Sequence, residues 1–93
     1  MKAYFGAWLG LGLALTIGAA PALADGFNKC TTVPKASWKP QSEAEALAKA
    51  AGYEVRRSKI EGTCYEVYGV KDGKLFELFY SPADLKLMHT TAK

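Results

Sequence analysis

The chain has 93 residues, of which 12 are lysine or arginine and 9 are aspartate or glutamate, giving a net charge of +3 at pH 7. This length allows one small domain and excludes a second hydrophobic core. The weak positive charge comes without a block of like charges, which argues against nucleic acid as a partner.

The first 24 residues have the features of an export signal. No charge lies between Lys2 and Asp25, and the stretch ends in Ala22-Leu23-Ala24, the small-x-small pattern that signal peptidase cleaves. An uncleaved membrane anchor is the alternative, because about 20 apolar residues can span a bilayer. The glycines and Pro21 within the stretch favour removal, and no cysteine follows the cut to carry a lipid anchor. We therefore expect a signal peptide at residues 1–24 and a periplasmic or secreted mature protein.

Cys30 and Cys64 are the only cysteines, and both lie in the exported part of the chain. Because the exported compartment is oxidising, we expect a disulfide between them. A zinc site usually needs four ligands, whereas the chain has two cysteines and one histidine, and a redox pair needs Cys-x-x-Cys spacing. The disulfide would stabilise a mature domain of 69 residues, whose hydrophobic core alone is marginal.

Residues 25–39 are predicted to be an extended lead-in segment without regular periodicity, which carries the large apolar side chain of Trp38. A helix is expected to follow, starting near Pro40, with Ser42 as N-cap and Glu45 completing a capping box. It is expected to run to about residue 51, with Gly52 at the position after the C-cap. Its buried stripe is mostly alanine: Ala44, Leu47, Ala48 and Ala51.

Three strands are predicted after the helix, at residues 53–60, 63–71 and 74–80. The turns between them are Glu61-Gly62 and Asp72-Gly73. The first strand needs a bulge near residues 56–58, because Val55 and Ile60 cannot otherwise share a face. Residues 85–89 are expected to form either a short fourth strand or a tail, and residues 90–93 are expected to fray.

The Asp72-Gly73 turn predicts the register of the second hairpin. As a two-residue loop it places Lys71 opposite Lys74, so that one face becomes apolar throughout and is the face that the helix should cover. That face carries Tyr65, Val67, Gly69, Phe76, Leu78 and Tyr80. The second face is mixed and carries Cys64, Glu66, Tyr68, Val70, Leu75, Glu77 and Phe79. A disulfide at Cys64 is expected to draw the lead-in segment, Trp38 included, across this second face.

The order of several short motifs resembles the PepSY domain family, in particular its short stand-alone secreted members. These motifs are Ala51-Gly52-Tyr53-Glu54-Val55, Cys64-Tyr65-Glu66-Val67, the turn Lys71-Asp72-Gly73 and a strand that runs into Ser81-Pro82. Many members close with an Asp-Pro-x-x-Gly turn, whose glycine is absent here. The resemblance implies an α+β fold with one helix packed on a three- to four-stranded antiparallel sheet, here formed by residues 40–93 and tethered by the disulfide to the N-terminal segment. It also implies a non-catalytic role, since PepSY domains occur in the propeptides of secreted metallopeptidases and are thought to inhibit or modulate peptidases.

The residues themselves offer little catalytic or metal-binding chemistry. His89 is the only histidine and follows Met88, but two such residues are too few for a coordination sphere, so we expect no metal and no cofactor. Glu66 and Glu77 are expected to be solvated strand residues, because no candidate nucleophile or second base accompanies them. We therefore predict no catalytic residue, and an enzyme is the least favoured class.

Four residues are candidates for binding: Arg56, Arg57, Tyr68 and Phe79. The arginines form a basic cluster on the first strand, which either protects a sheet edge from aggregation or docks an acidic surface. The two aromatic residues are expected to be left uncovered on the second face, where they would act as interface anchors.

The sequence thus predicts a non-catalytic exported binding module that modulates or inhibits a peptidase or another envelope protein. No nucleic acid is expected as a partner, and no stable membrane anchor after cleavage of the signal. The alternative is a small-ligand sensor or accessory subunit of an envelope system. A pocket with convergent polar groups would favour that alternative, whereas an exposed apolar patch or a free sheet edge would favour a protein partner.

Overall fold

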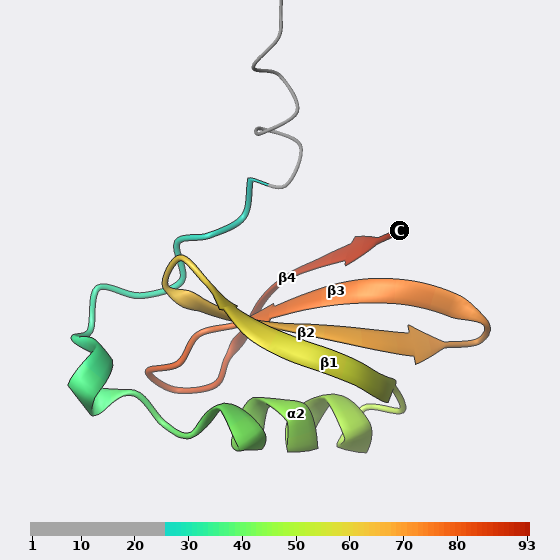
Figure 1. The fold of residues 1–93 in the computed structure, drawn as a ribbon, viewed down its shortest axis with the longest axis horizontal. Helices are drawn as coiled ribbons and strands as arrows, with labels where there is room; N and C mark the ends of the chain where they lie inside the picture. The colour runs from blue at the N-terminus through green and yellow to red at the C-terminus, as the bar shows by residue number, and fades with distance from the viewer. Residues whose placement is uncertain (1–25) are drawn as a thin grey trace, which may run out of the picture.

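The structure, a computed structural model, describes residues 26–93. A short 3-10 helix η1 (Lys35–Ser37) and the helix α2 (Gln41–Ala50) precede four strands, β1 (Glu54–Glu61), β2 (Cys64–Lys71), β3 (Lys74–Tyr80) and β4 (Leu87–Ala92). The strands form one antiparallel sheet in the order β1-β2-β3-β4, and α2 packs on one face beneath β1 and β2 (Figure 1). This confirms the predicted α+β fold. The signal peptide expected at residues 1–24 lies outside the described residues.

The N-terminus of α2 differs from the prediction. The helix begins at Gln41 with Pro40 as N-cap, and no side chain caps its free N–H groups. The capping box of Ser42 and Glu45 is therefore wrong. The Glu45 carboxylate instead accepts a hydrogen bond from the Ser58 hydroxyl on β1, which accepts one from Gln41 Nε2 at 2.7 Å. Glu45 thus contacts the sheet instead of the N-terminus of its own helix.

The C-terminus of α2 is as predicted. Gly52 follows the C-cap with φ +98°, and its N–H donates to the Lys49 carbonyl at 3.0 Å. The next N–H, of Tyr53, donates to the Ala48 carbonyl at 3.0 Å, which completes a Schellman motif and turns the chain into β1. Lys71 Nζ donates to the Ala51 carbonyl at 2.9 Å and places a cation at the negative end of the helix dipole.

The second hairpin has the predicted register. Lys71 pairs with Lys74, and both Asp72 and Gly73 have positive φ, as a type I′ turn requires. Every pair between β2 and β3 therefore falls where the sequence places it, with the apolar face toward α2.

The first hairpin turns one residue later than predicted. Glu61 pairs with Cys64, so the turn is Gly62-Thr63, with positive φ only at the glycine, as in a type II′ turn. The expected bulge is confirmed, because the register shifts between Val55 and Arg57.

A fourth strand is present and is longer than expected. β4 runs to Ala92, and the Lys93 N–H donates to the Leu75 carbonyl at 2.8 Å, so the prediction that residues 90–93 fray is wrong. These residues pair with β3, and no local sequence pattern indicates that pairing.

The hydrophobic core lies between α2 and the sheet. Its buried members are Ala44, Ala48, Tyr65, Val67, Leu78 and Tyr80. Leu47, predicted on the buried stripe, is instead 42% exposed. The two buried alanines bring the helix close to β1 and β2.

The lead-in segment wraps around one end of the sheet and touches both faces. The predicted disulfide joins Cys30 to Cys64. Trp38, expected on the second face, packs instead on the helix side, where its ring meets Tyr65 edge to face at 5.7 Å and its Nε1 donates to the Val33 carbonyl at 2.9 Å. Phe27 takes the second face. Within residues 26–93 no helix is long and apolar enough to cross a membrane.

Candidate docking surface

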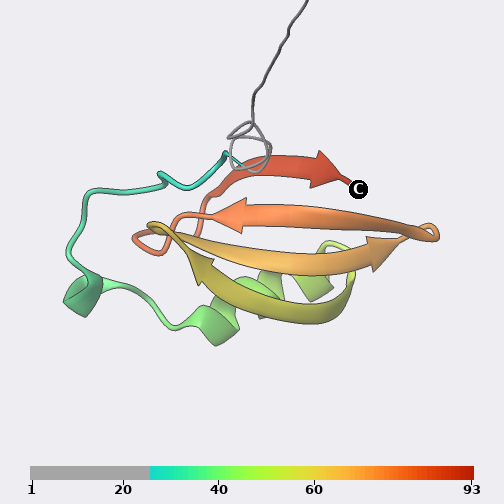
Figure 2. The same cartoon turned by 45° about the horizontal axis from the view of Figure 1, so that its top comes forward.

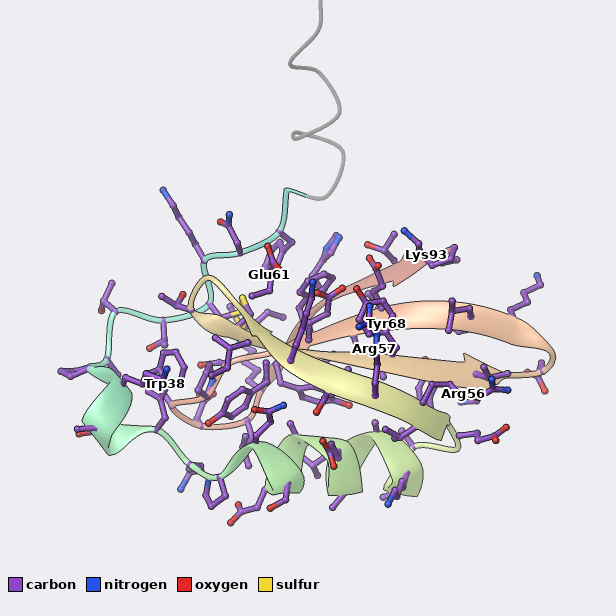
Figure 3. All side chains as sticks on the ribbon, viewed as in Figure 1. Trp38, Arg56, Arg57, Glu61, Tyr68 and Lys93 are labelled. Atoms are coloured by element: carbon purple, nitrogen blue, oxygen red, sulfur yellow. A yellow bond between two sulfur atoms is a disulfide. The ribbon has the colours of Figure 1, made fainter. Side chains whose placement is uncertain are left out.

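Arg57 and Tyr68 form a stacked pair on the second face of the sheet. Arg57 on β1 lies opposite Tyr68 on β2, and its guanidinium carbon is 4.5 Å from the centroid of the tyrosine ring. The two side chains lie beside each other on the face away from α2 (Figure 3). This cation-π contact holds the guanidinium in a fixed place while leaving its edge open to a partner.

Arg56 is the extra residue at the bulge of β1. Its side chain is 57% exposed, and its only ion pair among the described residues is with Glu54 at 3.6 Å. Exposed pairs of this kind contribute little, because water screens them, so the guanidinium remains available to a partner. The bulge therefore places two arginines in succession at an edge of the sheet.

Phe79 does not belong to the surface that Arg56, Arg57 and Tyr68 form. Its exposed fraction is only 3%, because Phe27 packs against it at 5.4 Å between ring centroids and His89 at 5.8 Å. The expectation that Phe79 is uncovered is wrong. The lead-in segment supplies the cover, as expected, but through Phe27 rather than Trp38. We call Arg56, Arg57 and Tyr68 the arginine surface.

Two glutamates that were expected to be solvated are buried beside the arginine surface. The exposed fractions of Glu66 and Glu77 are 3% and 8%. Lys59 Nζ lies 3.8 Å from the Glu66 carboxylate, and Lys93 Nζ lies 3.4 Å from that of Glu77. Together with Glu61 and Tyr68 these residues line a depression of about 200 Å³, and we call this group the carboxylate cluster.

The carboxylate cluster was missed because its burial depends on strands distant in sequence. Glu66 and Glu77 are diagonal neighbours on β2 and β3, and Lys93 reaches Glu77 only because β4 continues to the end of the chain. The one signal available in the sequence was the register itself, which already placed both glutamates among aromatic residues on the second face.

Burial raises the pKa of Glu66 above its ordinary value, and the nearby charge of Glu77 raises it further. The Tyr68 hydroxyl and the Lys59 ammonium act in the opposite direction. The pKa of Tyr68 is also raised, first by burial and then by the charge of Glu66. The cluster is therefore a coupled set of groups in which a proton on Glu66 is favoured more than in water.

A family model described as "Peptidase propeptide and YPEB domain" matches residues 9–91 of the 93 residues. The chain belongs to the PepSY family. This confirms the resemblance stated above. No curated protein and no solved structure matches the chain. PepSY domains are generally non-catalytic modules of the propeptide or inhibitor type, and the match is consistent with a peptidase-related, protein-binding role.

His89 of this PepSY domain has a structural contact. Its ring stacks on Phe27 with centroids 4.6 Å apart and planes 12° from parallel. In the part of the chain that the structure describes, no group of three or more histidine, cysteine, aspartate or glutamate residues is arranged to hold a metal ion.

The raised pKa of Glu66 leads to a testable pH dependence. Because the folded PepSY domain holds this proton more tightly than the unfolded chain, Glu66 favours folding most below the ordinary glutamate pKa of 4.5, and this contribution is lost as pH rises through the folded-state pKa. Glu66→Gln stays neutral at every pH. We therefore expect the free energy of unfolding of the variant, relative to wild type, to increase between pH 4.5 and pH 7. Urea denaturation across this range measures the difference, and parallel profiles for the two proteins would contradict it.

Proposed function

We propose that this PepSY domain is an exported, non-catalytic binding module that modulates or inhibits a peptidase or another envelope protein. The arginine surface is the observation that supports the proposal best. Arginine and tyrosine are enriched among the residues that dominate protein interfaces, and here the exposed Arg57 of the edge strand β1 stacks on the half-buried Tyr68 of β2. Two guanidinium groups in succession fit a partner with carboxylates at the docking site.

A periplasmic or secreted location is part of the proposal. The Cys30–Cys64 disulfide fits an oxidising compartment, and PepSY domains are typically extracellular. In this proposal residues 1–24 are removed on export, residues 25–39 remain as the lead-in segment, and residues 40–93 form the PepSY domain. The mature protein would keep a small positive charge, since loss of Lys2 leaves 11 basic against 9 acidic residues.

The size of the depression at the carboxylate cluster argues for a protein partner over a small ligand. Ligand pockets usually measure roughly 300–1,000 Å³, whereas this depression holds about 200 Å³ and its neighbour beside Phe27 and His89 about 90 Å³. Both fit single side chains of a docked protein better than a whole small molecule. The small-ligand sensor remains the second candidate, supported by these convergent polar groups and by an open, mostly apolar depression of about 410 Å³ between α2 and Leu85.

Reversing the charge of the arginine surface should abolish partner capture without unfolding the protein. We expect Arg56→Glu/Arg57→Glu to lower the yield of crosslinked partner from periplasmic extract by about tenfold or more, because like charges would then face an acidic partner. The free energy of unfolding should fall by only about 1 kcal/mol, mainly from loss of the cation-π contact between Arg57 and Tyr68. Quantitative mass spectrometry of the crosslinked proteins and a thermal melt measure the two effects.

A matched control carries the same change of net charge elsewhere on the surface. Lys74→Glu/Lys86→Glu alters two exposed lysines outside the arginine surface and should capture partners as the wild type does. Equal capture by the arginine variant and this control would overturn the proposal for this surface.

A further inference from the structure

β4 is an edge strand whose outer side has no partner strand within residues 26–93 (Figure 2). The Lys93 N–H donates to the Leu75 carbonyl, so this pair is of the hydrogen-bonded type. Because the two types alternate along an antiparallel ladder, Thr91 and His89 also bond toward β3. The N–H and C=O groups of Thr90 and Ala92 must then point away from the sheet. They form a ready template for another strand.

The two edge strands, β1 and β4, differ in how well they are protected against pairing with a strand of another molecule. β1 carries five charged residues among eight and is bulged at Arg56, which are the usual devices against edge-to-edge association. β4, with the sequence Leu-Met-His-Thr-Thr-Ala, carries no aspartate, glutamate, lysine or arginine, and it is regular from His89 onward. Leu87 and Met88 are 46% and 40% exposed at its start.

We propose that β4 pairs antiparallel with β4 of a second copy of this chain, across a two-fold axis at Thr90. The pairing is self-complementary. Thr90 would face the partner's Thr90, His89 the partner's Thr91, and Met88 the partner's Ala92. No two like charges would lie opposite each other, and threonine pairs across strands are favourable.

A second copy fits this edge because β4 itself carries no charge and its exposed apolar start, Leu87 and Met88, would be covered by the same strand of the partner. Lys86 and Lys93 bracket β4, and in the antiparallel pair Lys93 lies opposite the partner's Leu87 and one position from the partner's Lys86. A parallel copy would set lysine against lysine. The exposed apolar start of each strand is thus covered by the end of the other, which closes the interface in an isologous dimer.

The dimer extends the proposed function without depending on it. Two four-stranded sheets would become one continuous sheet of eight strands, with β1 and its arginine surface at each outer edge. A single dimer would then offer two docking surfaces that face different partners or two sites on one partner.

Sedimentation equilibrium of the exported, disulfide-bonded protein tests the proposal. Because few residues pair, the interface is small, and we expect the average mass to rise from monomer to dimer over a range of about 1 to 500 µM. Thr90→Lys should raise the dissociation constant by about tenfold or more, since two ammonium groups would oppose each other at the axis. Thr32→Lys is the matched control, because it adds the same charge at an exposed position of the lead-in segment.

A second variant excludes misfolding as the cause. Thr90→Pro removes only an N–H that points away from β3, so the β3–β4 ladder should survive while dimerisation is lost. Circular dichroism establishes that each variant is folded. A wild-type protein that stays monomeric throughout the range, or a Thr90→Lys variant that dimerises as well as Thr32→Lys, would overturn the proposal. Dimerisation of the Arg56→Glu/Arg57→Glu variant is expected to be unchanged, so failure of the docking proposal and failure of the dimer are separate results.

Discussion

Replacing both Cys30 and Cys64 by serine is expected to lower the free energy of unfolding by about 2 to 5 kcal/mol. The disulfide closes a long loop, with a sequence separation of 34, which restricts the unfolded chain. The disulfide also tethers the lead-in segment to the sheet. Beside it, the Cys30 N–H donates a hydrogen bond to the Thr63 hydroxyl at 2.8 Å. The loss is a large part of the stability of a domain of this size.

Two readouts measure this loss. Urea denaturation of wild type and the double variant gives the difference in free energy, and wild type with dithiothreitol should approach the variant. Trp38 is the only tryptophan after residue 24, so its fluorescence reports whether the lead-in segment still packs on the helix side. Equal stability of the oxidised and serine proteins would refute a stabilising role for the bond.

The second large loss of stability is expected when Gly62 is replaced by alanine. A Cβ atom at this position would lie 2.2 Å from the backbone oxygen of Asn28 and 2.7 Å from its Cβ, and the residue has φ +60°. Asn28 cannot simply move away, because its carbonyl accepts the Thr63 N–H at 2.9 Å. We expect Gly62→Ala to lower the free energy of unfolding by about 2 to 4 kcal/mol, from left-handed backbone strain and a lost hydrogen bond together.

Gly73→Ala is the matched control for Gly62→Ala. Gly73 has a similar φ of +77°, but a Cβ there would meet nothing within 4 Å, so its cost should be the backbone strain alone, about 1 kcal/mol. The excess at Gly62 therefore measures the contact with the lead-in segment. In the background of the two serines this excess should shrink, because the released segment can move aside. Equal costs at the two glycines in the wild-type background would show that the contact with Asn28 has no energetic weight.

Local sequence features were sufficient to predict most of the sheet. The Asp72-Gly73 dipeptide requires two positive φ values in succession, and that requirement alone sets the register of β2 against β3. Strict alternation then assigns each side chain to a face, which is why the face covered by α2 was predictable. Gly52 ended the helix for the same kind of local reason.

The candidate site was less predictable, because its members meet only through tertiary contacts. Arg57 and Tyr68 were both predicted as binding residues, yet their stacking depends on the bulge at Arg56, which moves Arg57 into line with Tyr68. In the sequence, Phe79 and Tyr68 are both aromatic residues assigned to the second face, and both were expected to be uncovered. Phe79 differs from Tyr68 because Phe27, which is distant from it in the sequence, packs against its ring and buries it.

Burial of charge is likewise a property of the assembled sheet. In the sequence, Glu66 and Glu77 look like the solvent-exposed polar residues of an ordinary strand. They are buried because Lys59 of β1 and Lys93, which follows β4, pack beside them in the folded sheet. Trp38 shows the same limit, since the disulfide predicts that the lead-in segment is tethered but not which face each of its residues reaches. Turn chemistry and alternation act between neighbours in sequence and can be seen in the chain itself. Burial is the sum of contacts from every segment that reaches a residue, and it exists only after those segments have packed.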